Sequence, residues 1–128
     1  MTSFKLGVWN SQADLSDDEA AGLYFRLIDG KWTPPGFDAE VYAFYSRLTG
    51  CYPEIDLVPE NELDSCPWAC AIELSGAHVI LAIQPDQSES MLPLVLSLAE
   101  EHGLVCFDPQ SAKVHLPLRL KARRAVNG

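Results

Sequence analysis

Hydrophobic and polar positions alternate along this chain with two different periods, and each change of period marks the border of a predicted element. Residues 4–9 (FKLGVW) alternate apolar with small or polar side chains, which is typical of a strand. The SDDE motif that begins at Ser16 has the form of a capping box, and apolar residues then recur at helical spacing. The pattern therefore predicts a helix over residues 17–28, which ends at Gly30.

The rest of the pattern predicts further strands and helices, separated by turns that contain proline and glycine. In chain order these are a helix over 38–50, an exposed loop over 52–65, a hairpin of strands 68–74 and 78–83, a helix over 90–102, a buried strand over 104–108 and a final strand over 113–120. Pro93 fits the third helix only in its first turn, so we expect that helix to begin at about Ser90. Pro117 favours an edge position for the final strand, because an edge tolerates the missing N–H.

The order of these elements predicts one α+β domain over residues 1–120, followed by a basic tail over 121–128. Without the second helix and the final strand, the order is the βαββαβ order of a ferredoxin-like sandwich. We therefore expect a mainly antiparallel sheet with its helices on one face. The other face is then exposed to solvent, covered by the tail, or paired with a partner such as a second copy in a homodimer.

The chain of 128 residues has a formal net charge of −9, and its charges are unevenly distributed. All eighteen acidic residues and only four of the nine basic ones lie in residues 1–112, whereas residues 113–128 carry five basic residues and no acid. A body this acidic repels nucleic acid and anionic membranes and attracts basic proteins. A basic protein is therefore the expected partner, and nucleic acid and membrane are not expected.

The sequence contains no motif for a metal, a cofactor or a catalytic centre. The four cysteines lack the spacing of zinc ligands, and Cys70 and Cys106 lie in apolar runs where a buried thiol is expected. No phosphate-binding loop, dinucleotide-binding motif or G-x-S-x-G motif is present. No apolar run is long enough to span a bilayer, and residues 1–10 lack a signal-peptide pattern. The absence of these motifs predicts a protein without a metal or cofactor. Reduced thiols and the lack of a signal-peptide pattern predict a cytoplasmic location.

The predicted loop over residues 52–65 is the first candidate site. It carries five acidic residues, namely Glu54, Asp56, Glu60, Glu62 and Asp64. Like-charged clusters mainly steer association, so this loop is interpreted as either a solvated surface or a docking surface for a basic partner. A metal or catalytic role is less favoured, because the D-x-D-x-D-G order of a calcium loop is absent. Trp68 is expected to be either an aromatic anchor of that surface or part of the core.

A second candidate site combines residues from the end of the third helix and the last two strands. His102 suits the negative end of a helix dipole, and Asp108 with Gln110 frames a proline turn. His115 lies on the final strand, where it can meet Cys106 across the strand pair. Each of these residues has a structural explanation. The alternative is a small ligand-binding domain or enzyme with a pocket near His102, Asp108 and His115.

Two segments, residues 64–69 (DSCPWA) and 102–110 (HGLVCFDPQ), resemble a family of small uncharacterised bacterial proteins of about this length. The pair at 8–9 (VW) and the helix around 44–48 extend the resemblance over most of the chain. Some members resemble immunity proteins encoded beside polymorphic or contact-delivered toxins, and that association is the only functional content of the resemblance. With the acidic composition, it favours a non-enzymatic cytoplasmic binding protein that occludes a basic toxin or effector domain.

Overall fold

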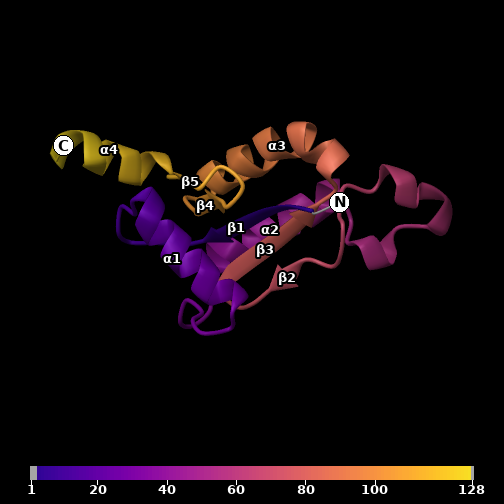
Figure 1. The fold of residues 1–128 in the computed structure, drawn as a ribbon, viewed down its shortest axis with the longest axis horizontal. Coiled ribbons are helices and arrows are strands. Elements are labelled where there is room, and N and C mark those ends of the chain that lie inside the picture. The colour runs from indigo at the N-terminus through magenta and orange to yellow at the C-terminus, as the bar shows by residue number, and fades with distance from the viewer. Residues whose placement is uncertain (1–2, 128) are drawn as a thin grey trace.

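A five-stranded antiparallel sheet lies at the centre of the computed structural model, which describes residues 3–127 apart from the side chains of 123–127 (Figure 1). The elements in chain order are β1 (Phe4–Trp9), α1 (Asp17–Ile28), α2 (Ala39–Cys51), η1 (Ile55–Leu57), η2 (Glu60–Ser65), β2 (Glu73–Leu74), β3 (His78–Ile83), η3 (Pro85–Gln87), α3 (Ser88–Glu101), β4 (Val105–Asp108), β5 (Lys113–His115) and α4 (Leu118–Asn127), where η marks a 3-10 helix. The prediction of an α+β domain with a mainly antiparallel sheet is confirmed. No helix in the described part of the chain is long and apolar enough to cross a membrane.

The strands lie in the order β2-β3-β1-β4-β5, and every neighbouring pair is antiparallel. The central strand, β1, pairs with β3 along its whole length but with β4 only over residues 7–9. At one edge of the sheet, the Asp17 carboxylate of α1 accepts the backbone N–H of Val114 in β5 at 2.8 Å. A side chain therefore occupies part of the edge that a further strand would need.

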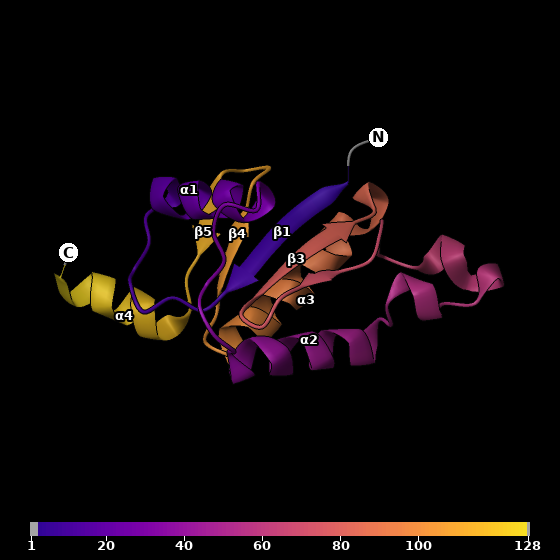
Figure 2. The same cartoon turned by 90° about the horizontal axis from the view of Figure 1, so that it is seen from below.

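The helices lie on both faces of the sheet (Figures 1 and 2). Leu6 and Val8 of β1 pack with α2 and α3 in one hydrophobic core, whereas Trp9 packs with α1 in a second core. The expectation that all helices share one face is therefore wrong. The physical reason is that the second face also carries large apolar side chains, namely Trp9 of β1, Ile80 of β3 and Phe107 of β4, so leaving either face in water is unfavourable. α1 and Leu120 of α4 pack on the face that was expected to be open.

Tyr24 of α1 packs directly on Gly7 of β1. A Cβ atom at position 7 would lie only 2.7 Å from Cδ1 of Tyr24, so any larger residue would collide with the ring. Glycine leaves the space that the phenol ring fills. The same ring contacts Phe107 of β4, with 5.4 Å between the ring centroids. Gly7 therefore determines how closely α1 can pack on the sheet.

The first two helices begin at the capping residues that the sequence contains. Ser16 Oγ accepts the N–H of Glu19, and the Glu19 carboxylate accepts the N–H of Ser16, which confirms the predicted capping box. Asp38 caps α2, because its carboxylate accepts the N–H groups of residues 40 and 41. Both helices therefore start within one residue of the predicted position.

Two further elements differ in extent from the prediction. α3 begins at Ser88, before the expected start, because the 3-10 turn η3 runs directly into it. Pro93 therefore lies inside the helix, at an exposed position, rather than in the first turn. In the predicted strand over 68–74, only the last two residues form β2, and Trp68 makes an isolated bridge with β3.

The C-terminal segment is a strand followed by a helix, rather than the single strand predicted over 113–120. β5 ends at His115, and the carbonyl of Pro117 then accepts the N–H groups of Leu120 and the following residue, as at the start of a helix. Alternating apolar residues have the period of a strand, but a strand would place Leu118 and Leu120 on one face. Leu118 is exposed and Leu120 is buried. The segment from 121 onward, expected to be a tail, continues α4 as far as residue 127.

Candidate functional site

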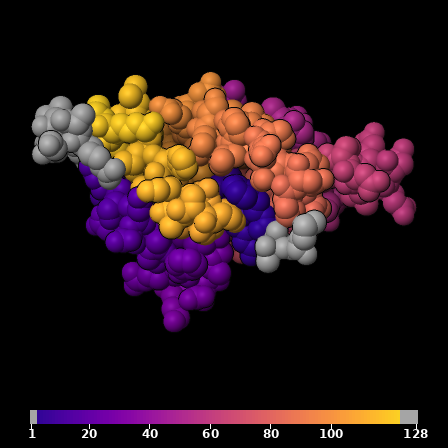
Figure 3. All heavy atoms as spheres, turned by 45° about the horizontal axis from the view of Figure 1, so that its top comes forward, coloured from indigo at the N-terminus to yellow at the C-terminus, as the bar shows by residue number. Residues whose placement is uncertain are grey.

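The acidic loop projects beyond the end of the sheet (Figures 1 and 3). We call residues 52–65, which include η1 and η2, the acidic protrusion. None of these residues is buried. Beyond residue 52, the backbone hydrogen bonds of the protrusion join residues three apart, so short 3-10 turns give the segment its shape.

Trp68 and Gln87 hold the two ends of the acidic protrusion to the body of the protein. The indole N–H of Trp68 donates to the carbonyl of Tyr52 at 2.9 Å. The side-chain amide of Gln87 donates to the carbonyls of Ser65 and Cys66 at 3.2 and 3.1 Å. Trp68 is fully buried, so it is not available as an aromatic anchor for a partner. It instead positions the start of the protrusion.

Glu54 connects the acidic protrusion to the body at a third point. One oxygen of its carboxylate accepts the hydroxyl of Tyr45 at 2.6 Å, and the other accepts the backbone N–H of Ile72 at 3.0 Å. The hydrogen bond to Glu54, together with burial, raises the pKa of Tyr45 from 10.0 to about 12. Of the five acids predicted to face a partner, Glu54 is therefore engaged within the protein.

The other four acids of the protrusion are exposed, and they are Asp56, Glu60, Glu62 and Asp64. A groove of about 330 Å³ crosses the segment. Its walls are largely apolar, and they include Tyr52, Leu57, Val58, Pro59 and Pro67 beside Glu62. The Leu57 side chain is 76% exposed, which is unusual for a leucine. Residues 48–112 contain eleven acids and no lysine or arginine, so this segment supplies no positive charge to offset them.

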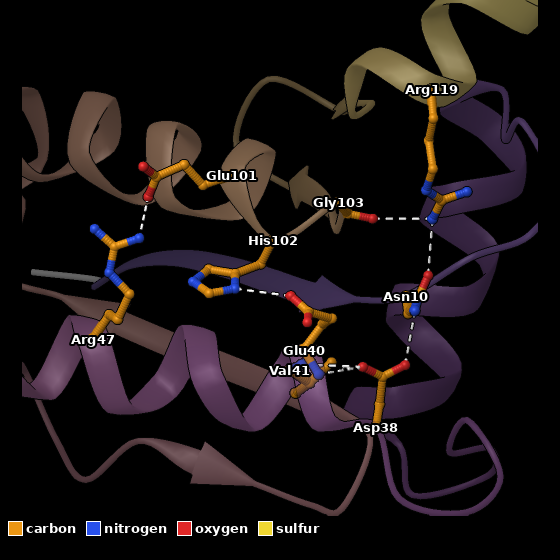
Figure 4. Close-up of polar contacts among 9 residues, drawn as sticks. All are labelled: Asn10, Asp38, Glu40, Val41, Arg47, Glu101, His102, Gly103 and Arg119. Carbon is orange, nitrogen blue, oxygen red and sulfur yellow. Dashed lines mark hydrogen bonds and ion pairs between the residues drawn. The ribbon is translucent and has the colours of Figure 1, made fainter.

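A second polar cluster joins the ends of several elements, and Figure 4 shows its side chains. His102, at the C-terminal end of α3, contacts Glu40 of α2, with 2.9 Å between Nδ1 and Oε2. The other ring nitrogen is buried and has no partner among the described residues. Arg47 and Glu101 form an ion pair between the same two helices. His102 therefore links α2 to α3, with one ring nitrogen on Glu40 and the other buried.

Arg119 of α4 completes this cluster (Figure 4). One of its terminal nitrogens donates to Oδ1 of Asn10 at 2.9 Å and to the carbonyls of Ser11 and Gly103 at 2.8 and 3.0 Å. The amide of Asn10 then donates to the Asp38 carboxylate at 2.8 Å. The start of α4 is thereby attached to the end of β1, to the turn after α3 and to the start of α2. These contacts are structural, and the sequence pattern did not predict them.

Asp108 and Gln110 form the turn between β4 and β5. Oδ1 of Asp108 accepts the N–H groups of Gln110 and Ser111 at 2.9 and 3.3 Å. The Gln110 amide pairs with the backbone of Lys5: Nε2 donates to the carbonyl at 2.8 Å, and the Lys5 N–H donates to Oε1 at 2.6 Å. Because Pro109 lacks an N–H, β4 cannot extend its ladder along β1. The glutamine side chain takes the place of the missing strand partner.

His115 lies directly opposite Cys106 in the β4–β5 pair, and both line a cavity of about 140 Å³ beside α3. Burial raises the pKa of the Cys106 thiol, so the sulfur stays protonated and is a poor nucleophile. His102 and Asp108 do not line this cavity. The predicted pocket near His102, Asp108 and His115 is therefore not formed by these three residues together. Within residues 3–127, no group of three or more His, Cys, Asp or Glu side chains is placed to hold a metal ion.

Comparison with protein-family models, with curated proteins and with solved structures found no match to this chain. The resemblance to small bacterial proteins with immunity-type members therefore stays a prediction. The acid-rich composition was the only feature of the sequence that marked the protrusion. Tyr45 and Gln87, which support it, were not among the predicted site residues, because each contacts it from a separate helical element.

Proposed function

We propose that this protein is a non-enzymatic binding protein of the immunity type, which occludes a basic toxin or effector domain through its acidic protrusion. The observation that carries the proposal is that four exposed carboxylates and a largely apolar groove share one projecting segment. Polar rims around apolar contacts are the usual composition of protein-binding surfaces. A cytoplasmic location belongs to the same proposal and is supported by the four free cysteines.

The distribution of charge supports a basic partner. Because residues 48–112 contain no lysine or arginine, and Arg47 just before them is paired with Glu101, we expect the exposed acids of the protrusion to attract a cationic surface before contact. Such long-range attraction raises the association rate and weakens as salt is added. The groove then offers apolar contact once the partner has arrived.

The attachment of the protrusion supports the same function. Trp68, Gln87 and Glu54 hold the segment at both ends and near its start. A surface that is already ordered loses less conformational entropy when it binds than a flexible loop does. The buried tryptophan and the engaged glutamate therefore contribute to binding indirectly, by keeping the four exposed acids in place.

We also propose that strands β1 to β4, with α2 and α3, form a ferredoxin-like core to which α1, β5 and α4 are added. The antiparallel order β4-β1-β3-β2 and the common core of α2 and α3 support this description. In it, α1 is the additional helix, whereas the sequence pattern assigned that role to the second helix.

Affinity capture from the native organism, with three forms of the protein as bait, tests the proposed function. The first is the wild type. The second, called the protrusion variant, carries Asp56→Asn, Glu60→Gln, Glu62→Gln and Asp64→Asn. The third, called the control variant, carries Asp18→Asn, Asp29→Asn, Glu100→Gln and Glu101→Gln, which are exposed acids elsewhere. Both variants change the formal net charge from −9 to −5, so they differ only in where charge is removed.

We expect the wild type and the control variant to capture one basic protein in stoichiometric amount at low salt and to release it at high salt. The protrusion variant should capture little of it. The surface ion pairs lost in the control variant contribute little to stability, so this bait stays folded. Equal capture of the same protein by the protrusion variant contradicts the proposal.

A further inference from the structure

A hollow lies beside α1 on the face of the sheet that α1 only partly covers. In Figure 2, α1 lies over the β4–β5 side, and β1 and β3 are visible next to it. The hollow has two adjoining parts of about 400 and 310 Å³, and Ser3, Lys5 and Ile28 line both of them. We call it the Lys5 hollow. It shares no lining residue with the acidic protrusion.

Tyr24 contributes an unused hydrogen-bond donor to the Lys5 hollow. Its side chain lines the larger part and is only 2% exposed, but its hydroxyl is not among the buried unpaired groups, so solvent reaches the oxygen and no described residue hydrogen-bonds to it. Burial and the negative charges of Glu73 and Asp108 raise the pKa of Tyr24 to about 12. The phenol is therefore neutral at physiological pH and can donate its proton in a hydrogen bond.

Lys5 adds a positive charge to the same hollow. It belongs to the face of β1 that carries Gly7 and Trp9, because alternate residues of a strand share a face. Its side chain forms no ion pair with any described residue. The one acid that lines the described hollow, Glu73, contacts His78 at 3.3 Å. Lys5 and Tyr24 can therefore both donate hydrogen bonds into the hollow.

The remaining walls are largely apolar, and Phe25 and Ile28 are 55% and 44% exposed. We propose that the Lys5 hollow binds a small amphipathic carboxylate. Its carboxylate accepts hydrogen bonds from the Lys5 ammonium and the Tyr24 hydroxyl, and its hydrocarbon part covers Phe25 and Ile28. Small-molecule sites are typically apolar cavities that contain a small number of polar groups. This site does not depend on the proposed function of the acidic protrusion.

Amide NMR spectra of the 15N-labelled protein test this proposal with three probes that share one ring. Phenylacetate has an anionic end, phenylacetamide a neutral one and phenethylamine a cationic one. We expect phenylacetate to shift the amide resonances of Lys5, Gly7 and Ala82 in a saturable manner. The other two probes should bind about tenfold more weakly or less, because each lacks the charge-assisted hydrogen bond to Lys5.

Two pairs of variants, each with a substitution in the hollow and the same substitution outside it, test whether Lys5 and Tyr24 bind the carboxylate. Lys5→Gln should weaken phenylacetate binding by about tenfold and Tyr24→Phe by about threefold, in line with the loss of a charged and a neutral hydrogen bond. Lys31→Gln and Tyr42→Phe, at exposed positions outside the hollow, should leave binding unchanged. The same spectra show that each variant is folded. Equal binding of the three probes, a lack of saturable shifts, or unchanged binding in folded Lys5→Gln would each overturn the proposal.

Discussion

Glu54 contacts the body of the protein through its carboxylate, so its replacement differs in effect from replacement of its acidic neighbours. In Glu54→Gln, we expect the pKa of Tyr45 to fall from about 12 towards its ordinary value of 10.0, because the charged acceptor is lost. Titration of tyrosinate absorbance measures this change. Glu62→Gln is the matched control, because Glu62 is exposed, and it should leave the Tyr45 titration unchanged.

The raised pKa of Tyr45 also gives stability a pH dependence with a definite sign. Because the pKa is higher in the folded state, this contribution to the free energy of unfolding is fully present below pH 10.0 and is lost as the pH rises through about 12. Urea unfolding across that range should show a steeper loss in the wild type than in Glu54→Gln. If the free energy of unfolding depends on pH in the same way in both proteins, the hydrogen bond between Tyr45 and Glu54 is contradicted.

The Gln110 side chain pairs with the Lys5 backbone in place of a strand, so its removal should weaken the sheet at Lys5. Gln110→Ala removes both hydrogen bonds to the Lys5 backbone, so we expect the free energy of unfolding to fall by about 1 kcal/mol. The Lys5 amide should also exchange its hydrogen faster. Urea unfolding and hydrogen exchange measure these effects, and Asn61→Ala, at an exposed position, is the control. Unaltered protection of the Lys5 amide would show that the glutamine does not complete the ladder.

The packing of α1 on the sheet predicts opposite effects of the same substitution at two glycines. Gly7→Ala should lower the free energy of unfolding by about 1–3 kcal/mol, because the Tyr24 ring must move away from the new methyl group. Gly22→Ala should raise it by about 0.5–1 kcal/mol, because this glycine is helical and its added Cβ meets no atom within 4 Å. Urea unfolding of both variants measures the difference. Similar changes at the two positions are inconsistent with close packing of Tyr24 on Gly7.

The bounds of most elements could be predicted because they depend on local properties. The strands at 4–9 and 78–83 begin and end as predicted, and the capping box places the start of α1. The face of the sheet that a helix covers depends on contacts between distant residues, so periodicity alone could not assign α1. The nearly continuous apolar runs of the strands at 78–83 and 105–108 indicated that both faces would be covered, because such strands are buried on both sides. The alternation over 113–120 has the period of a strand, so it predicted one strand although α4 begins at Leu118.

For the molecule as a whole, composition predicted where the acidic surface lies but not how it is held. Four of the five acids are exposed as expected, because they lie together in one proline-containing segment. The roles of Glu54 and Trp68 come from contacts with other elements, which composition does not reveal. Of the three residues of the alternative pocket, His115 lines the cavity beside α3, whereas β4 separates His102 from Asp108 by roughly 13 Å of extended chain.

The central claim is that the acidic protrusion, rather than the overall negative charge, attracts a basic partner. The association rate of the captured partner with each of the three baits, measured by stopped flow at low and high ionic strength, tests it most directly. We expect fast association with the wild type and the control variant that slows as salt is added. The protrusion variant should associate about tenfold more slowly at low salt and respond little to salt. Equal association rates for the protrusion variant and the wild type at low salt would contradict the claim.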